Sequence, residues 1–262
     1  VSTAAWGLGY FGMPHILLRF MAIEDEKKLK LSRRVATIWV VISLFVAVFI
    51  GVIGYTMSKV GALEMLTGSN SETIIVKISA LLSQHGVIFA LLAGVILAGI
   101  LASTMSTSDS QLLAASSAVS SDILGAFRKD SSNKNGSMAA ARITLLVISV
   151  VAAFIARNPD SSVFAIVSFA WAGFGAAFGP VVLFSLFWKR TNKWGALAGM
   201  VCGGSMVFIW KYLIRPLGGI WNIYELLPAF LIACAAIVIV SLLTPKPSKE
   251  IEEEFDRVAQ MK

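Results

Sequence analysis

The sequence has 262 residues, of which 57% are hydrophobic and only 14% are charged, and its mean hydropathy is +0.80. This composition excludes an ordinary soluble domain and is typical of an all-α polytopic membrane protein. The net charge of +7 does not indicate a nucleic-acid partner, because the basic residues lie between apolar segments, where the positive-inside rule accounts for them.

The first predicted element, residues 1 to 20, is apolar and aromatic but contains three glycines and Pro14, so we expect an interrupted helix. In lipid, broken backbone is tolerated only where it is buried in protein or lines a cavity, and broken helices of transporters commonly line the substrate site. The alternative is a kinked helix that only packs. Because the chain begins at Val1, without an initiator Met or a signal peptide, we expect a fragment that starts inside a helix.

Six full spans follow this partial one in a transmembrane domain predicted over residues 1–243. Their predicted ranges are 37–57, 86–121, 139–156, 161–188, 194–214 and 223–243. A short outer helix is expected around 71–83 and an outer turn at 158–160. The tail, 244–262, is polar, acidic and helix-prone. With this alternation, the inner segments, which include the loop after Asp122, hold 17 of the 22 Lys and Arg residues, which places the tail in the cytoplasm.

A polar stretch interrupts the apolar span 86–121. Residues 103–110 carry six hydroxyls and one carboxylate. The hydroxyls could simply bond back to carbonyls four residues earlier and let helices approach closely. Alternatively, the hydroxyls of Ser106 and Thr107, with a freed carbonyl near Ser103, offer oxygen ligands to a small hard cation, of which sodium is the obvious candidate. The spacing alone does not decide between these interpretations.

Other chemistries find little support. The histidines, His15 and His85, are far apart in sequence and lack a partner motif for zinc or nucleophilic catalysis. Cys202 and Cys234 lie inside apolar segments, so we interpret them as packing residues. We therefore expect neither an enzyme nor an organic cofactor. Asp109 is a carboxylate inside a span and could relay protons, so a proton-coupled carrier is an alternative. A transporter-like membrane sensor is a further alternative, although the tail is too short for a signalling domain.

Three stretches resemble the sodium:solute symporter family. They are WGLGYFGMPHILLRFMA (6–22), MST (105–107) and AWAGFGAAFGPVVLFS (170–185), and the first and third resemble its proline-transporting branch. The resemblance extends to about residue 243. It implies the five-plus-five inverted-repeat fold of LeuT. This chain would then be the second repeat plus two trailing helices, without the N-terminal repeat.

The resemblance also implies a function and a site: sodium-driven uptake of L-proline across the cell membrane. Sodium would bind the backbone carbonyl of Ser103 and the hydroxyls of Ser106 and Thr107, with further ligands from the missing first helix. Position 103 is commonly Ala in this branch, but a backbone carbonyl does not depend on the side chain. Another small solute on the same scaffold remains an alternative.

Substrate contact and gating would fall on aromatic residues beside the interrupted helix. The resemblance places them at Trp6, Tyr10 and Pro14, where an aromatic face could cover the apolar ring of proline. Trp171 and Phe174 are further candidates, for which aromatic packing against small residues is the alternative.

Overall fold

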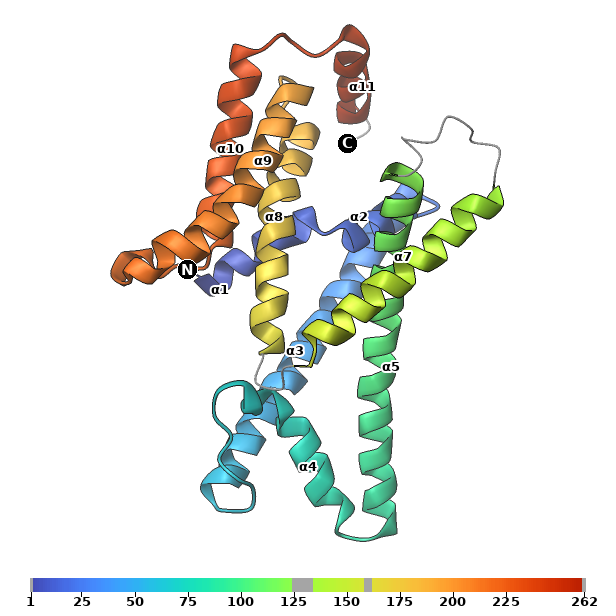
Figure 1. Ribbon diagram of the computed structural model, residues 1–262, viewed down its shortest axis with the longest axis vertical. Coiled ribbons are helices and arrows are strands. Elements are labelled where there is room, and N and C mark those ends of the chain that lie inside the picture. Colours follow the sequence, from blue (N-terminus) through green and yellow to red (C-terminus); the bar gives the residue numbers. More distant parts are fainter. Residues whose placement is uncertain (1, 124–133, 158–161, 261–262) are drawn as a thin grey trace. The chain divides into compact units, whose positions relative to one another are not determined.

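The structure of the protein is a computed structural model, which describes residues 2–123, 134–157 and 162–260. Among these residues the chain is almost entirely helical and contains no strand (Figure 1). Six of the helices are long and apolar enough to cross a membrane: Leu29–Lys59, Val87–Ser120, Met138–Ile155, Val163–Phe187, Lys193–Leu217 and Leu226–Leu243. The fold class predicted from composition is therefore confirmed.

The chain divides into two compact units. Residues 23–163 form one, here called the α3–α7 unit, and residues 1–22 with 164–262 form the other, here called the α8–α10 unit. Segments from both ends of the sequence thus belong to the α8–α10 unit.

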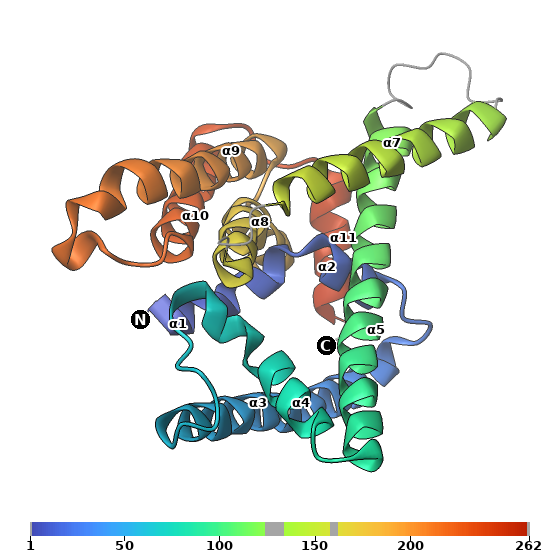
Figure 2. The same ribbon diagram turned by 60° about the horizontal axis from the view of Figure 1, so that its bottom comes forward.

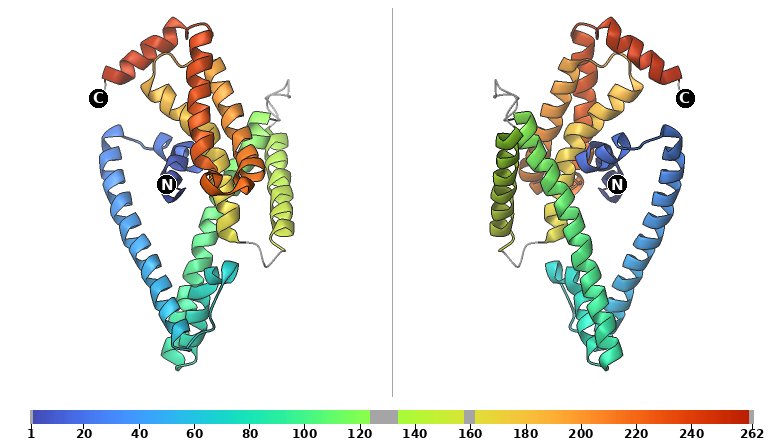
Figure 3. Two further views of the ribbon diagram at one scale, coloured as in Figure 1. Left: turned by 90° about the vertical axis from the view of Figure 1, so that its left-hand side faces the viewer. Right: turned by 90° about the vertical axis from the view of Figure 1, so that its right-hand side faces the viewer.

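In the α3–α7 unit the two longest helices, α3 and α5, converge at one end, where shorter helices join them, and a further long helix, α7, packs against α5 (Figure 3). Its elements are α3 (Leu29–Lys59), the 3-10 helix η3 (Gly68–Thr73), α4 (Ile74–Ser83), α5 (Val87–Ser117), the π-helix η4 (Ala118–Ile123) and α7 (Lys134–Ile155). Gly54 lets α4 approach α3, because a Cβ there would lie 2.2 Å from Ile74 Cγ1. The Ser116 hydroxyl donates to the carbonyl of Ala141 at 2.7 Å, which joins α5 to α7.

The α8–α10 unit begins with an interrupted helix and continues with three long ones (Figure 2). Its elements are α1 (Ser2–Ala5), the 3-10 helix η1 (Trp6–Gly12), α2 (Pro14–Met21), α8 (Val163–Phe187), α9 (Lys193–Ile209), three short turns η5 (Trp210–Ile214), η6 (Arg215–Leu217) and η7 (Gly219–Trp221), α10 (Leu226–Leu243) and α11 (Lys249–Gln260).

Glycines one turn apart let α9 pack closely on its neighbours. A Cβ at Gly199 would lie 2.4 Å from Ile237 Cγ1 on α10, and one at Gly203 would lie 2.2 Å from the carbonyl oxygen of Ala176 on α8. Small residues at such spacing bring helix backbones together in membrane proteins. The core around these contacts is fully buried at Ala172, Ala176, Val207, Leu226 and Ala229.

The turn between α8 and α9 holds the start of the tail. The Asn192 amide donates to Thr244 Oγ1 at 2.7 Å and to the carbonyl of Pro245 at 2.8 Å, while its Oδ1 caps α9 by accepting from Gly195 N–H at 2.8 Å. Lys189 forms an exposed ion pair with Asp256 of α11.

Several element bounds differ from the predicted ranges. Helix α3 begins at Leu29, eight residues before the predicted span, because the charged residues ahead of its apolar stretch are good helix formers. Helix α9 gives way to a π-helical turn at Trp210, inside the predicted span 194–214, and α10 begins at Leu226. Residues 124–133 of the predicted inner loop after Asp122, and the predicted outer turn at 158–160, lie outside the described residues.

Candidate functional site

The interruption in the first segment falls at Met13. Residues Trp6–Gly12 form a 3-10 helix, Met13 is extended at φ −82° and ψ 115°, and α2 then begins with Pro14 at its first position. Proline suits this position because the N–H it lacks would have no partner inside the helix. The break leaves backbone groups at the two facing helix ends without partners from their own helix, and such groups can bind the charged ends of a small solute.

Glycines bring η1 directly onto α8. A Cβ at Gly9 would lie 1.9 Å from Trp171 Nε1, and a Cβ at Gly12 would lie 2.4 Å from the carbonyl oxygen of Phe174. A Cβ at Gly175 would in turn lie 2.6 Å from the Cα of Gly9. Distances below 3.0 Å leave no room for a side chain, so this contact requires glycine on both elements.

The aromatic residues predicted for the substrate site meet where these elements touch. The rings of Trp6 and Trp171 are stacked with centroids 5.5 Å apart, and Tyr10 meets Trp171 edge to face at 4.8 Å. The Trp171 indole N–H also donates to the carbonyl of Trp6 at 3.0 Å. Trp6 is partly buried, whereas Tyr10 is 49% exposed and could cover an apolar ligand.

The other two predicted residues lie at the edge of this cluster. Phe174 follows Trp171 on α8, stacks on Phe178 at 6.2 Å and is 44% exposed. Pro14 lies just past the break and is exposed. The structure thus brings Trp6, Tyr10 and Trp171 into contact and leaves Phe174 and Pro14 beside them.

Two further aromatic residues belong to the cluster and were not predicted. Trp6 stacks on Phe164 with centroids 5.4 Å apart and on Tyr224 with centroids 5.8 Å apart. Phe164 lies seven residues before Trp171, two turns along the same face of α8, so helical spacing could have identified it. Tyr224 lies 218 residues after Trp6, in a turn before α10, and no local pattern indicates it.

The predicted sodium ligands lie on α5, in the α3–α7 unit. Ser103, Ser106 and Thr107 are all exposed, and the Thr107 hydroxyl donates to the carbonyl of Ser103 at 3.1 Å. Helix α5 is continuous from Val87 to Ser117. The prediction of a freed carbonyl near Ser103 is therefore wrong, because this carbonyl lies within a regular helix and not at a break.

The Thr107–Ser103 contact still places two oxygens suitably for one cation. Oxygens 3.1 Å apart can both lie about 2.4 Å from a shared ion, within the range for oxygen ligands of Ca²⁺, an ion of similar size. The next hydroxyl turn is similar, since Ser110 donates to the carbonyl of Ser106 at 2.8 Å. Local geometry therefore agrees both with helix back-bonding and with part of an ion site.

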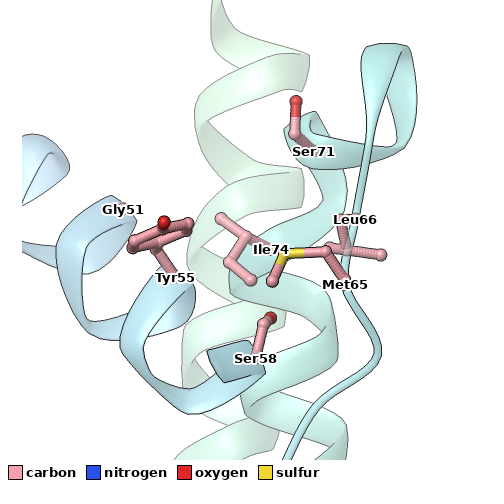
Figure 4. A pocket seen from close by; sticks show the side chains of 7 residues that line it. All are labelled: Gly51, Tyr55, Ser58, Met65, Leu66, Ser71 and Ile74. Carbon is pink, nitrogen blue, oxygen red and sulfur yellow. The ribbon is translucent and has the colours of Figure 1, made fainter. Parts of the chain in front are cut away.

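Neither the predicted substrate residues nor the predicted sodium ligands line the cavity shown in Figure 4. That cavity has a volume of about 170 Å³ and lies in the α3–α7 unit, between the end of α3 and the start of α4, where Tyr55, Met65 and Ile74 line it. Within the described ranges, no three His, Cys, Asp or Glu side chains gather as a metal-binding group.

The fold and the site are those of an all-α polytopic membrane protein in which an interrupted helix carries an aromatic cluster. Residues 1–203 match the sodium:solute symporter family, and the chain belongs to that family, whose members are transporters and not enzymes.

Several relatives carry the names of bacterial proline transporters. The sodium/proline symporter of Haemophilus influenzae is 41% identical over 98% of this chain and 50% of its own length, and that of Escherichia coli is 39% identical over 97% and 49%. The osmoregulated proline transporter OpuE of Bacillus subtilis is 39% identical over 95% and 49%. This chain thus spans about half the length of the curated relatives it matches. No solved structure matches it.

Proposed function

We propose that the chain is the C-terminal part of a symporter that takes up L-proline across the cytoplasmic membrane, driven by sodium moving down its gradient. The observation that carries this proposal is the aromatic cluster of Trp6, Tyr10 and Trp171 beside the break at Met13. Family membership and the names of the relatives support the same substrate and ion.

The aromatic cluster suits proline because the pyrrolidine ring is apolar while the carboxylate and ammonium groups are charged. The half-exposed ring of Tyr10 would cover the pyrrolidine ring, with Trp6, Pro14, Trp171 and Phe174 lining the surroundings. Backbone groups freed at the break would meet the charged ends. Burying one aromatic contact of this kind contributes about 1.5–3 kcal/mol to binding.

Sodium would bind the carbonyl of Ser103 with the hydroxyls of Ser106 and Thr107. To bind the ion, the Thr107 hydroxyl would turn its proton away from the Ser103 carbonyl, so that both oxygens face the cation. Three oxygens do not complete a coordination shell, and we propose that the rest come from an N-terminal repeat outside this chain. That repeat and this one would form the LeuT-like inverted-repeat fold.

Transport would proceed by alternating access. Sodium and proline would favour each other's binding because both stabilise the same occluded state, and a ligand shifts an equilibrium only by its differential affinity for the two states. The distribution of Lys and Arg supports a cytoplasmic C-terminus.

The experiment is uptake by the full-length protein reconstituted in proteoliposomes, with sodium, lithium and proton gradients imposed one at a time. We expect an inward sodium gradient to drive accumulation of proline. Uptake driven equally well by a proton gradient without sodium would contradict sodium coupling and favour a relay through Asp109. Accumulation of another solute in preference to proline would contradict the substrate.

A further inference from the structure

Tyr224 ties together three segments that are distant in sequence. It lies in the turn between η7 and α10 and is 9% exposed. Its hydroxyl donates to the carbonyl of Ser168 on α8 at 2.6 Å, and its backbone N–H donates to the Ser2 hydroxyl on α1 at 3.1 Å. A buried tyrosine whose polar tip is satisfied in this way has little freedom to move.

The ring of Tyr224 stacks on Trp6. The two planes are inclined by only 17°, and their centroids are 5.8 Å apart. Trp6 also stacks on Phe164, which lies one turn before Ser168 on α8. The hydroxyl of Tyr224 is therefore anchored to the same stretch of α8 that presents another ring to Trp6.

The Ser168 carbonyl accepts from Tyr224, whereas the Ser168 hydroxyl bonds to other residues of α8. The Ser168 hydroxyl donates to the carbonyls of Phe164 and Ala165, at 2.7 and 3.2 Å. The Tyr224 contact is thus a separate link between α8 and the turn before α10, and its removal leaves the Ser168 side chain bonded as before.

We infer that Tyr224 is a positioning residue of the substrate site: it holds the Trp6 indole in the orientation that receives the solute. This inference rests on the proposed function of Trp6 and extends it to a residue in the turn before α10, one that does not itself need to touch the substrate.

The hydrogen bond from Tyr224 to the Ser168 carbonyl requires a protonated phenol. Burial, and secondly the charge of Glu225, raise the pKa of the Tyr224 phenol above its ordinary value. Because an ordinary tyrosine phenol, with a pKa of about 10, is already neutral at physiological pH, the donor is present there, and the raised pKa extends its presence to more alkaline pH. Glu225 is itself held by Arg215, whose guanidinium donates to its carboxylate at 2.9 Å.

The test uses the full-length transporter with Tyr224→Phe, which keeps the ring and removes only the hydroxyl. We expect the apparent KM for proline to rise about fivefold, the effect of about 1 kcal/mol from one lost hydrogen bond. The maximal rate, and the sodium half-saturation measured without proline, should change little, because Trp6 contributes to substrate binding and not to the ion site.

Trp210→Phe is the matched control. It also removes one side-chain hydrogen bond to the same turn, since the Trp210 indole N–H donates to the carbonyl of Ile223 at 3.2 Å. The ring of Trp210, however, meets Trp221 edge to face and is not part of the stack on Trp6. We expect its proline KM to equal that of the wild type. Equal KM shifts in both variants would mean that the turn has merely loosened, and would overturn the inference.

A double-mutant cycle separates action through Trp6 from any direct effect. In a Trp6→Ala background, adding Tyr224→Phe should raise KM no further. If the two effects multiply instead, Tyr224 does not act through Trp6 and the inference fails.

A readout independent of transport keeps this test distinct from that of the proposed function. In protein labelled with 5-fluorotryptophan, the fluorine signal assigned to Trp6 should shift in Tyr224→Phe and stay in place in Trp210→Phe. An unshifted Trp6 signal would overturn the positioning role even if proline uptake is sodium-driven. A shifted signal in a protein that does not transport proline would instead contradict the proposed function alone.

Discussion

The aromatic cluster of the α8–α10 unit and the hydroxyl segment of α5 differ in how much of a site each one contains. Around Trp6, rings from η1, α8 and the turn before α10 are already in contact, and glycines fix the approach of the backbones. On α5, Ser103, Ser106 and Thr107 are exposed, and the hydroxyls of Thr107 and Ser110 donate to carbonyls of the same helix.

Burial differs in the same direction across the two units. Within the most apolar stretch of each span, 28%, 22% and 33% of residues are buried in α8, α9 and α10, against 0%, 6% and 0% in α3, α5 and α7. A substrate-binding surface can thus be largely built within this chain, whereas an ion site on α5 requires ligands from elsewhere.

The 262-residue chain by itself should show no sodium-dependent proline uptake. The three oxygens on α5 are too few to hold a dehydrated sodium ion, and we expect the remaining ligands in a repeat outside this chain. The measurement is uptake into proteoliposomes containing the chain alone, with the full-length protein as the control. Sodium-driven uptake by the chain alone would show that its ion site is complete.

Gly12→Ala should abolish or severely reduce uptake by the full-length protein. The added Cβ would lie 2.4 Å from the Phe174 carbonyl oxygen, and overpacking of this kind costs roughly 1–3 kcal/mol and displaces η1 from α8. Gly7→Ala is the control on the same 3-10 helix, since a Cβ there meets nothing within 4 Å. Equal activity of the two variants would mean that close contact with α8 is not required.

Trp6→Ala and Tyr10→Ala should raise the apparent KM for proline at least about tenfold, because each removes apolar cover worth about 1.5–3 kcal/mol. The sodium half-saturation measured without proline should stay unchanged. Tyr212→Ala, at an aromatic residue that is 61% exposed in the same unit, serves as the control. Wild-type proline affinity in both test variants would reduce these rings to packing residues.

Thr107→Ala should raise the sodium half-saturation about five- to hundredfold, because it would remove one of the proposed oxygen ligands at a cost of about 1–3 kcal/mol. Ser106→Ala should behave similarly, while Thr107→Ser keeps the oxygen and should be mild. Ser110→Ala is the control, since its hydroxyl bonds one turn further along α5. If only Ser110→Ala shifts the half-saturation, the ion lies on that turn; if none of them does, the hydroxyls serve helix packing.

The sequence predicted what local patterns determine. Apolar runs located the helices, and the glycines with Pro14 marked the interruption that falls at Met13, because these residues act on their own backbone. Hydroxyl spacing likewise brought Thr107 and Ser103 together within one helical turn. Such features require no knowledge of the packing between helices.

Contacts between distant segments could not be predicted in this way. Tyr224 meets Trp6 only because α10 packs beside α1 and η1, and the requirement for Gly12 appears only when α8 is in place. Similarly, no pattern in α5 identifies the oxygens that would complete the ion shell. The parts of the site that depend on tertiary packing therefore came from the structure or remain proposals.

The most direct test of the account is the linkage between proline and sodium in the full-length protein. Proline affinity should be measured over a range of sodium concentrations, and sodium affinity with and without proline, in the wild type and in Thr107→Ala. The account predicts that each ligand raises the affinity for the other by the same factor, and that the loss of proline affinity in Thr107→Ala at low sodium is partly recovered at high sodium. Proline affinity that is independent of sodium in the wild type, or a Thr107→Ala defect that high sodium leaves unchanged, would contradict it.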